Sequence, residues 1–268
     1  ARFLQRHKLS GLYRIHEGPS EDRLNKLRAF LGELGLGLSG GEKPSPLDYT
    51  RLLEQVRDRP DAHLIQTVML RSLAQAIYSP ANVGHFGLAL EAYAHFTSPI
   101  RRYPDLQVHR AIRHVLNGGR PVDFPYNHAD LVGLGEHCSM AERRADEAVR
   151  DAVEWLKCEF MLDKVGQVFD GIITGVTGFG LFVELSGVYV EGLVHVTALR
   201  NDYYHFDPVG HRLHGERSGQ VYRLGDSLRV RVARVDLDDR KIDFELVESE
   251  RRENGRRNRW NRGQRRKD

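Results

Sequence analysis

The sequence predicts a multidomain α+β protein: a mostly helical part, residues 1–164, then a five-stranded β-barrel, residues 165–248, and a disordered basic tail, residues 249–268. Three observations support this prediction. Apolar residues recur at helical spacing in the first part, change to two-residue alternation after Gly166, and give way to arginine after Ser249. The long helical pattern excludes a doubly wound α/β sheet, in which strands and helices would alternate.

Helix start signals divide the first part into segments. Ser20 opens a stretch with acidic residues in its first turn, and Ser45 with Pro46 opens another. The run "ARFLQRHKL" at residues 1–9 is typical of the end of a helix, so we expect the chain to be a piece of a longer protein. The expected helices cover residues 20–36, 45–56, 61–79, a segment from Pro104 and about 130–165.

Short alternating or β-branched runs, separated by glycine or by Asp, Gly and Ser clusters, predict strands in the second part. Five strands in about 80 residues match the size of an OB-fold barrel, and a small sandwich is the alternative. The stretch at about 200–220 is an insertion for which no strand is predicted. The expected strands are residues 167–176, 178–185, 188–196, 227–236 and 241–247.

Composition limits the class of protein. The uncharged stretch at residues 171–183 is too short to span a bilayer, which takes roughly 20 residues. The first residues carry charge from Arg2 onward, so we expect that they are not a signal peptide. Cys138 and Cys158 fit neither a disulfide framework nor a metal motif. We therefore expect reduced thiols, a cytoplasmic location and no contact with a membrane.

The net charge of +3 conceals a basic tail. Residues 249–268 hold nine Lys or Arg and three acidic residues, a charge of 9 − 3 = +6, which leaves −3 for the rest. Such a tail is too polar to bury a core and is expected to be disordered. A solubilising terminus is one interpretation; an RNA-binding arm with Arg256, Arg257 and Trp260 is favoured because arginine dominates.

The stretch "HFTSPIRRYPDLQVHR", residues 95–110, holds Arg101 and Arg102 between two prolines. Pro99 and Pro104 disfavour the helical conformation in the residue before each, and Pro104 suits the start of a helix. A stiff loop before a helix N-terminus can present planar, permanently charged guanidinium groups to a phosphate. The alternative is a pair of ordinary surface arginines, and the loop alone does not decide between them.

Phe179 and Phe182, in the second predicted strand, are candidates for stacking on nucleic-acid bases. Strict alternation would place them on opposite faces, so that one or both would be core. The glycines at 178 and 180 suggest instead a bend or bulge that turns both rings outward.

The barrel segment carries a resemblance to a known family. The runs "GQVFDGIITGVTGFGLFVELSGVYVEGLVHVTAL" and "LGDSLRVRVARVDLDDRKIDFEL" resemble the ribosomal S1-type RNA-binding domain. Aromatic faces stack on any base, and a nearby arginine can hold the RNA backbone. The resemblance implies an RNA-contacting patch made of Phe179, Phe182, His195, Asp236 and Arg240.

The first part carries a second resemblance. The run "YSPANVGHFGLALEAYAHFTSPIRRYPDLQVHRAI" resembles the closing portion of the catalytic RNB domain of the ribonuclease II/R family, and "HCSMAERRADEAVRDAVEWLKCEFM" is similar to the helix that joins that domain to its barrel. The resemblance implies that Arg101 contacts the scissile phosphate as a catalytic residue. It implies supporting RNA contacts for Arg102, Tyr103 and Asp105.

His85 and Phe86, in "GHFGLAL", could line the RNA channel that the family resemblance implies. The alternative for His85 is a core histidine that its neighbours satisfy.

The family resemblance implies metal-assisted hydrolysis, with Mg²⁺ held by clustered aspartates. We expect the full-length enzyme to bind Mg²⁺ through an upstream cluster and this chain to bind no metal. Asp236, Asp238 and Asp239 have suitable carboxylates but lie in a predicted hairpin turn. His109 and His114 would lie about 140° apart on a helix, which excludes a shared metal ion.

Two functions from different classes remain. The first is the C-terminal part of a processive 3′→5′ exoribonuclease that degrades single-stranded and structured RNA to nucleoside 5′-monophosphates. The alternative is a stand-alone, ribosome-associated RNA-binding protein without catalytic activity. The arginine loop favours the enzyme, because a pure binding protein would not need it. The expected partners are RNA and, beyond it, the ribosome or other RNA-decay components, with the protein itself a monomer.

Overall fold

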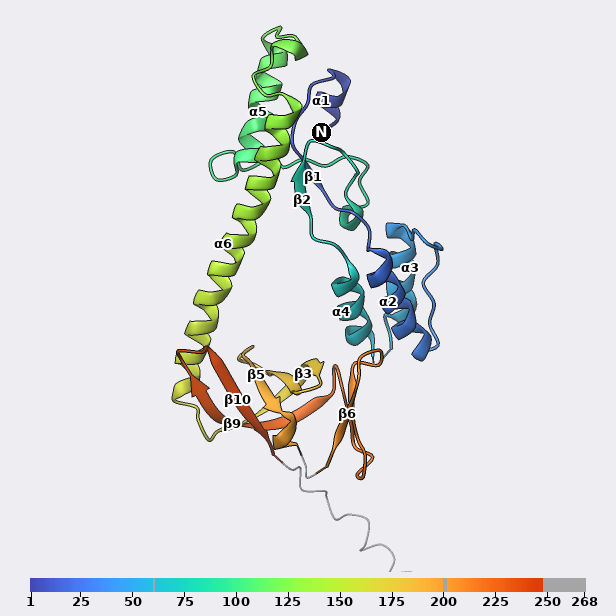
Figure 1. Ribbon diagram of the computed structural model, residues 1–268, viewed down its shortest axis with the longest axis vertical. Helices are drawn as coiled ribbons and strands as arrows, with labels where there is room; N and C mark the ends of the chain where they lie inside the picture. The colour runs from blue at the N-terminus through green and yellow to red at the C-terminus, as the bar shows by residue number, and fades with distance from the viewer. Residues whose placement is uncertain (60, 200–201, 248–268) are drawn as a thin grey trace, which may run out of the picture. The chain divides into compact units, whose positions relative to one another are not determined.

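The structure, a computed structural model, describes residues 1–59, 61–199 and 202–247 (Figure 1). The chain divides into two compact units, residues 1–154 and residues 155 onward. The described part confirms the predicted fold class, since a mostly helical portion precedes a closed five-stranded barrel. The point of division falls within helix α6, His128–Leu162, and the first barrel strand begins at Val168.

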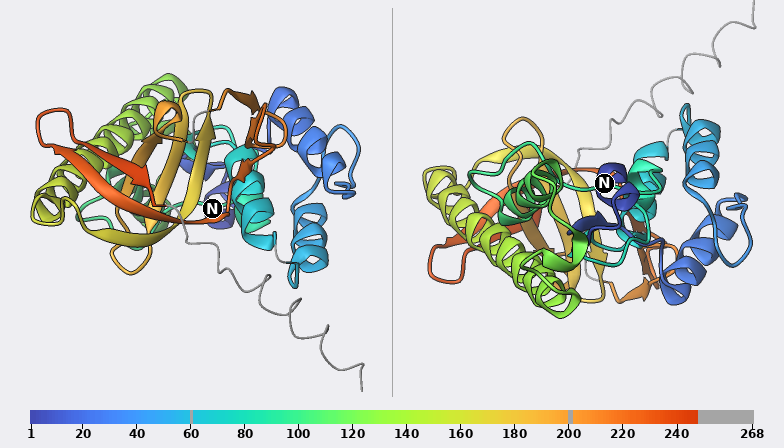
Figure 2. Two further views of the ribbon diagram at one scale, coloured as in Figure 1. Left: turned by 90° about the horizontal axis from the view of Figure 1, so that it is seen from below. Right: turned by 90° about the horizontal axis from the view of Figure 1, so that it is seen from above.

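Three helices of the first unit pack on one another: α2, Glu21–Glu33; α3, Pro46–Val56; and α4, Ala62–Ser72. They are drawn in blue to cyan in Figure 2. Each matches the start of an expected helix, and each buries its apolar side because those residues recur at helical spacing. The buried residues include Leu24, Leu27, Phe30, Leu31, Leu52, Val56, Ile65 and Met69.

The start of α3 is fixed by a capping box between Ser45 and Asp48. The Asp48 carboxylate also accepts a hydrogen bond from the hydroxyl of Ser39 at 2.5 Å. These bonds, with that from Ser39 the strongest cause, lower the pKa of Asp48 to about 2. The sequence signal of Ser followed by Pro therefore marks the true first turn.

A second apolar cluster joins α1, Arg2–Arg6, to α5, Tyr103–Leu116. The short 3₁₀ turn η2, Pro121–Asp123, follows α5 and leads Phe124 into the same cluster. This packing anchors α5, and through it the arginine loop that precedes it. The cluster is made of Leu4, Leu9, Val108, Ala111 and Phe124.

The predicted helix over residues 61–79 is wrong beyond Ser72. Residues Ile77–Ser79 form strand β2, which pairs antiparallel with β1, Tyr13–Ile15. The hydrogen bonds of this pairing join segments more than 60 residues apart, so local spacing could not reveal it. The strand buries Tyr78 and places it beside α6, where the Tyr78 N–H donates to the hydroxyl of Ser139 at 2.9 Å.

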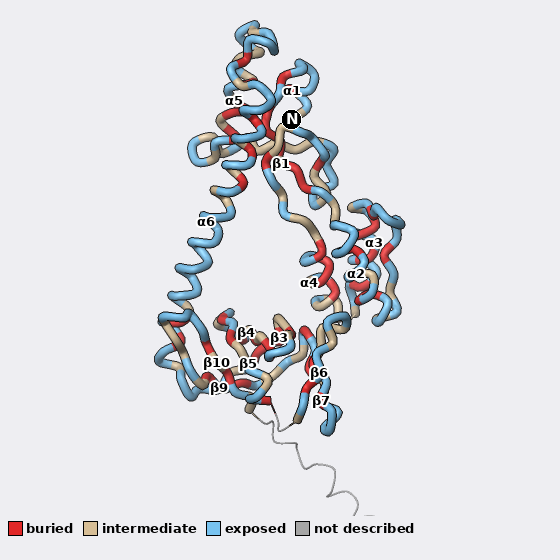
Figure 3. Tube along the Cα trace, viewed as in Figure 1, coloured by how far each residue is buried: buried red, intermediate tan, exposed pale blue. Residues whose placement is uncertain are grey.

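Helix α6 begins two residues before the expected start and ends at Leu162 rather than near residue 165. Its middle is exposed along most of its surface, which Figure 3 shows in pale blue. Among the helices of the described residues, none has both the length and the apolar content needed to cross a membrane.

The second unit confirms the predicted barrel rather than a sandwich. Strands close in the order β10-β5-β4-β3-β9, with β5 and β10 parallel and the remaining neighbours antiparallel. Alternation points every second side chain inward, so that Leu181, Val183 and Leu185 of one strand are all buried. The strands are β3, Val168–Thr177; β4, Gly180–Leu185; β5, Glu191–His195; β9, Ser227–Asp236; and β10, Lys241–Leu246.

The insertion between β5 and β9 forms a separate three-stranded antiparallel sheet after the short 3₁₀ turn η3, Val196–Ala198. The sequence did not predict these strands, because each has only three or four residues and they carry histidine, arginine, aspartate and glycine. They are β6, Tyr204–Asp207; β7, Arg212–Gly215; and β8, Val221–Arg223.

Candidate nucleic-acid interface

The arginine loop of the first unit is a tight turn around Ser98. The carbonyl oxygen of Ser98 accepts hydrogen bonds from the backbone N–H groups of Arg101 at 3.2 Å and Arg102 at 3.0 Å. Helix α5 follows with Arg102 as its N-cap, so Tyr103 is already helical although it precedes Pro104. The turn brings both arginines to the N-terminus of α5, as the sequence predicted.

Asp105 fixes this turn from inside. Its side chain is fully buried, and one carboxylate oxygen accepts hydrogen bonds from the Ser98 N–H at 2.7 Å and from Nη2 of Arg102 at 2.8 Å. Because Asp105 is inaccessible, the supporting contact expected of it becomes an indirect one, through Arg102 and the loop. Oδ1 of Asp105 and Nε of Arg102 are buried without a hydrogen-bond partner among the described residues.

Arg101 differs from Arg102 in exposure and in partners. The Arg102 side chain is 26% exposed and paired with Asp105, whereas Arg101 is exposed. Within the described part of the chain, no ion pair or side-chain hydrogen bond holds the Arg101 guanidinium. Its planar donors are therefore available to a ligand such as a phosphate.

Both arginines lie at a groove of about 710 Å³ that the first unit contains. One wall comes from the loop and the start of α5, and the other from one side of α6, where residues repeat at spacings of three and four. The α6 wall carries an imidazole, a thiol and two carboxylates. The lining residues are Tyr78, Arg101, Arg102, Tyr103, Pro104, Leu134, His137, Cys138, Ala141, Glu142, Ala145 and Asp146.

Arg14 and Glu142, which no sequence motif marks, form an ion pair at this groove. Nη1 of Arg14 lies 2.5 Å from Oε2 of Glu142, and its guanidinium carbon lies 4.6 Å from the centroid of the Tyr78 ring. The pair joins positions 128 residues apart, so no local signal could have found it. The hydroxyl of Tyr78 in turn contacts Nδ1 of His95 at 2.9 Å, and burial followed by the charges of Arg102 and Arg14 lowers the pKa of His95.

Tyr103, expected to contact RNA, is 38% exposed. Its hydroxyl lies 3.0 Å from that of Tyr126, and Nη1 of Arg110 donates to both oxygens at 3.2 and 3.0 Å. The hydrogen bond with Tyr126 is the main cause that raises the pKa of Tyr103. The ring thus borders the groove in a fixed orientation.

His85 and Phe86 do not line the groove. Nδ1 of His85 accepts a hydrogen bond from the Leu88 N–H at 3.2 Å, and its ring centroid lies 5.0 Å from that of His16. The Phe86 ring meets Tyr49 edge to face, 5.3 Å between centroids. Burial, followed by the neighbouring charges, lowers the pKa of His85. Both residues are half-buried members of an aromatic cluster.

In the barrel, Phe179 is not part of a strand. It lies with Gly178 in the two-residue turn between β3 and β4, so alternation does not apply to it, and it is 51% exposed. Phe182, on β4, points away from the barrel core while Leu181 and Val183 point inward. The two rings meet edge to face with centroids 6.0 Å apart. The expected bulge occurs in β3, between Ile173 and Gly175, rather than at the flanking glycines.

His195 completes this group. It is the exposed last residue of β5, opposite Gly180 of β4, and the N–H of Val196 donates to the carbonyl oxygen of Phe179 at 2.8 Å. Nδ1 of His195 lies 2.8 Å from Oγ1 of Thr197, which holds the ring. The turn thus places one imidazole next to the exposed phenylalanine.

Asp236 and Arg240 lie at another end of the barrel surface. Leu193 pairs with Asp243 in the parallel β5–β10 ladder, so the turn before β10 lies toward the start of β5, whereas His195 is at its end. Four strand residues correspond to roughly 13 Å. Oδ1 of Asp236 accepts the N–H of Asp239 at 2.9 Å, the main cause that lowers its pKa. Arg240 is exposed, with a left-handed φ of 54° in the turn.

Two further expectations concern the basic tail and the metal site. Arg256, Arg257 and Trp260 lie outside the described residues. Within the described ranges, no three His, Cys, Asp or Glu side chains are grouped so that they could hold a metal ion. The carboxylates of this part of the chain therefore do not fit a magnesium cluster.

Comparisons with known protein families agree with the two-part architecture. The RNB domain matches residues 1–118, and the S1 RNA binding domain matches residues 162–246. The arginine loop lies in the first match, and the five barrel strands lie in the second.

Among curated proteins, ribonuclease R of Escherichia coli strain K12 is 58% identical over 259 residues, which cover 94% of this chain and 32% of that protein. The chain thus spans about a third of the length of the curated relatives it matches. The apo structure of Mycoplasma genitalium RNase R is similar with a TM-score of 0.83 and 27% identity, over 92% of this chain and 39% of that one. The structure of the same protein in complex with ribose-methylated single-stranded RNA is similar with a TM-score of 0.82, at the same identity and coverage.

The fold also occurs in yeast Ssd1, described as a pseudonuclease, with a TM-score of 0.63 at 21% identity over 80% of this chain and 27% of that one. At that identity the likeness concerns the fold alone.

Proposed function

Because this chain carries RNB and S1 domains and matches ribonuclease R along 94% of its length, we propose that it is the C-terminal part of a hydrolytic 3′→5′ exoribonuclease that processively releases nucleoside 5′-monophosphates. The observation that carries this proposal is Arg101, an exposed guanidinium in a groove, on a loop that a buried carboxylate holds. An RNA-binding surface alone would not need such a loop.

In this proposal, Arg101 donates hydrogen bonds to the non-bridging oxygens of the scissile phosphate. Negative charge grows there as the bond from phosphorus to the 3′ oxygen breaks, and a preoriented fork stabilises it more than it stabilises the ground state. Arg102 and Asp105 act as positioning residues, because their 2.8 Å ion pair holds the turn that aims Arg101. Tyr103 closes the rim of the groove.

Mg²⁺ is the metal expected of the complete enzyme. We assign its ligands to residues that this chain does not contribute, since the described carboxylates do not group as a metal site. In this proposal, the chain contributes the contact of Arg101 with the scissile phosphate and the RNA-binding surface of the barrel. We keep the domain boundaries at residues 164 and 248 as part of the proposal.

The barrel is proposed to hold single-stranded RNA behind the reacting end. Phe179 and Phe182 offer ring faces for stacking, and His195 borders them. Arg240, roughly 13 Å along the surface, would contact the backbone a few nucleotides away. Asp236 supports that turn through its hydrogen bonds to backbone N–H groups.

His85 and Phe86 are assigned a structural part near the RNA channel, through their aromatic cluster. We further propose that structured RNA is also a substrate. The tail would bind the ribosome or other RNA-decay components through Arg256, Arg257 and Trp260. The protein is proposed to be a monomer located in the cytoplasm. The RNA-bound structures of Mycoplasma genitalium RNase R support the RNA part.

One observation favours a second candidate, an RNA-binding protein without catalytic activity. The S1 match covers residues 162–246, whereas the described residues hold no group of three His, Cys, Asp or Glu side chains that could bind a metal ion. The pseudonuclease Ssd1 has the same fold, so the fold does not decide between the two candidates.

The test compares the purified 268-residue chain with the complete gene product, using end-labelled single-stranded RNA and Mg²⁺. We expect both to bind RNA and only the complete protein to shorten it, releasing nucleoside 5′-monophosphates. A complete protein that binds RNA but leaves it intact would establish the binding candidate. Mononucleotide release by the 268-residue chain alone would refute our assignment of the metal ligands.

A further inference from the structure

The insertion between β5 and β9 is separate from the barrel in topology. The barrel closes through β3, β4, β5, β9 and β10, so β6, β7 and β8 contribute no strand to it. One face of the small sheet is apolar and mostly buried: Tyr204, Leu213 and Tyr222 are at most 7% exposed, while Phe206 on the same face is 39% exposed. That face fixes the sheet to its unit and leaves the opposite face for another role.

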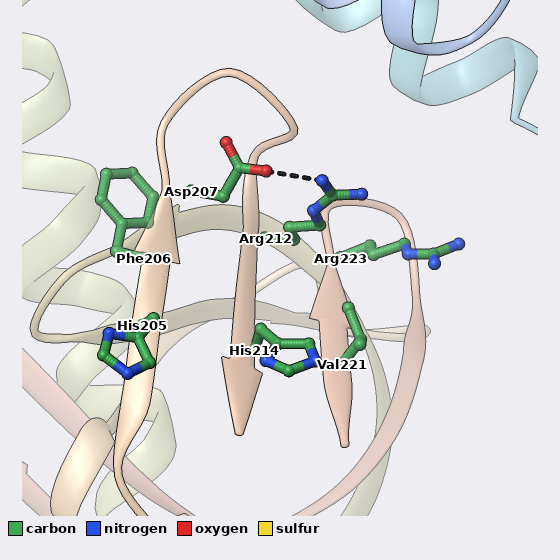
Figure 4. Close-up of a pocket in the computed structure, with 7 residues that line it drawn as sticks. All are labelled: His205, Phe206, Asp207, Arg212, His214, Val221 and Arg223. Carbon is green, nitrogen blue, oxygen red and sulfur yellow. Dashed lines mark ion pairs between the residues drawn. The ribbon is translucent and has the colours of Figure 1, made fainter. Parts of the chain in front are cut away.

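Strand register shows which residues share the opposite face. His205 pairs with His214, and His214 with Val221, in one row across the three strands. Asp207 pairs with Arg212, and Arg212 with Arg223, in the next row. Because side chains alternate along a strand, these two rows point away from the buried tyrosines. Figure 4 shows them side by side, with the imidazoles near one end and the charged groups near the other.

The charged row is organised rather than loosely solvated. Nη2 of Arg212 lies 2.7 Å from Oδ2 of Asp207, and Oδ1 of that carboxylate accepts N–H groups of Val209 and Gly210, both at 3.0 Å. A Cβ at Gly210 would lie 2.7 Å from Oδ2 of Asp207 and 2.9 Å from Nε of Arg212. A side chain at residue 210 would therefore crowd the ion pair, and the pair holds the Arg212 fork over the turn.

Arg223 lies next to this pair with its own charge uncompensated. It is exposed, and in the described parts of the chain no ion pair or hydrogen bond engages its guanidinium. The carboxylate of Asp207 already serves Arg212 and the turn. Cross-strand neighbours have Cβ atoms about 5 Å apart, so the two guanidinium groups form one cationic surface with an excess positive charge. The face lines a pocket of about 370 Å³.

We propose that this outer face of β6–β8 is a second binding site for single-stranded RNA, with Arg223 and Arg212 on a backbone phosphate and His214 against a base. This inference rests on the proposed function and adds a site that the S1 resemblance does not assign. Guanidinium forks match phosphate oxygens, and histidine rings stack on unpaired bases. Glu216, 3.8 Å from Nε2 of His205, limits the positive surface at the imidazole end and leaves His214 as the base contact.

A metal site is the competing use of two facing histidines. A stable zinc site needs three or four ligands. In the described ranges no such group of three exists, here or elsewhere. The chemistry of the face therefore favours an anionic, planar ligand.

The experiment measures binding of a fluorescently labelled single-stranded RNA to the 268-residue chain by anisotropy, in EDTA, over a range of salt concentrations. Arg223→Ala is expected to weaken binding about five- to tenfold at low salt and to flatten the slope of log K against log[salt] by about 0.7, the share of one phosphate contact. Arg217→Ala is the matched control, because it removes an exposed arginine from the β7–β8 turn of the same insertion outside the pocket. We expect it to change affinity less than about twofold.

Each further outcome decides the proposal. Equal effects of Arg223→Ala and Arg217→Ala would reduce the site to general charge and overturn it. Unchanged RNA binding in Arg223→Ala with lost binding of polyglutamate would assign the face to an acidic protein partner instead. If Arg223→Ala lowers the melting temperature, the variants Arg223→Lys and His214→Ala replace it as the test of the site. Weaker RNA binding by both variants, measured on folded protein, supports the site. Wild-type RNA binding by both variants refutes it.

Phe179→Ala separates this proposal from the one it rests on. Weakened binding in Phe179→Ala with wild-type binding in Arg223→Ala refutes the insertion site and leaves the RNA-binding barrel standing. Absence of RNA binding in the unmodified chain refutes the proposed function itself.

Discussion

The arginine loop and the barrel patch of Phe179, Phe182 and His195, both proposed to contact RNA, hold their side chains in different ways. Asp105, which orients the loop, is fully buried and bonded to both Ser98 and Arg102, whereas Phe179 lies in a turn and is 51% exposed. A guanidinium must meet a phosphate at defined distances and angles, so its support has to be rigid. A ring that stacks on any base tolerates a looser support. The loop therefore suits a chemical step, and the patch suits holding a chain that moves.

Replacing Arg101 should have a greater effect than any other change to the loop or the barrel patch. In the complete enzyme, Arg101→Lys keeps a charge but loses the planar fork, and we expect kcat to fall on the order of 100-fold with little change in RNA affinity. Steady-state kinetics with single-stranded RNA measure it. Arg113→Lys, an exposed arginine on α5 outside the groove, is the control and should keep wild-type kcat. An unchanged kcat in Arg101→Lys would make Arg101 an ordinary surface residue.

Substitutions in the barrel patch should change the affinity for RNA rather than kcat. Phe179→Ala is expected to weaken single-stranded RNA binding by about 1–3 kcal/mol and to leave the melting temperature almost unchanged, because the ring is exposed. Equilibrium titration and thermal melting of the same protein measure both quantities. Phe182→Ala should add a small loss of stability, since that ring is half-buried against Gly175. A large fall in melting temperature for Phe179→Ala would identify the ring as core.

A smaller change is expected when the support of the loop is altered at Asp105. Asp105→Asn removes the charge opposite Arg102 with little change in volume, and we expect kcat to fall about tenfold as the loop loosens. RNA affinity should stay the same. A general loss of folded protein would instead lower both kcat and RNA binding. Combining Asp105→Asn with Arg101→Lys should cost little beyond Arg101→Lys alone, because Asp105 acts through the loop. Fully additive effects would contradict that role.

The two units should also differ in their response to acid. In the first unit, burial lowers the pKa values of His85 and His95, so the unfolded chain binds protons first and stability falls as pH drops below about 6.5. In the second unit, hydrogen bonds lower the pKa values of Asp202, Asp207 and Asp236, so that stability is lost only below about pH 4.

Hydrogen exchange read by mass spectrometry, corrected for the intrinsic effect of pH, follows each unit separately. Between about pH 7 and pH 5, we expect protection to fall in residues 1–154 and to hold in the barrel strands. His95→Gln should reduce the loss in the first unit. Earlier loss of protection in the barrel would contradict this difference.

The sequence predicted the barrel better than the surfaces around it. The five strands were predictable because inward residues such as Leu181, Val183 and Leu185 alternate without interruption. Strand β2 was missed because its stability depends on pairing with distant β1, and the insertion was missed because its strands are short. Local signals, namely proline positions and the alternation of apolar residues, were therefore sufficient to predict whole helices and strands.

The candidate site was predictable where it depends on neighbours in the chain. Arg101 and its loop follow from two prolines and a helix start, but the burial of Asp105 depends on packing that local spacing does not reveal. The Arg14–Glu142 pair joins segments 128 residues apart, and Phe179 escaped the strand pattern because two residues make a complete turn. Tertiary contacts decide the burial of Asp105 and the Arg14–Glu142 pair, whereas Phe179 lies in a local two-residue turn.

A double-mutant cycle in the complete enzyme tests whether the loop acts on the phosphate while the barrel holds the RNA. Single-turnover hydrolysis is measured at saturating and at low RNA for Arg101→Lys, Phe179→Ala and the double variant. We predict that Arg101→Lys alone lowers the saturated rate, that Phe179→Ala acts only at low RNA, and that the double variant shows the product of the two effects. A lower saturated rate in Phe179→Ala, or coupling of more than about 0.5 kcal/mol between the two changes, would contradict this division of roles.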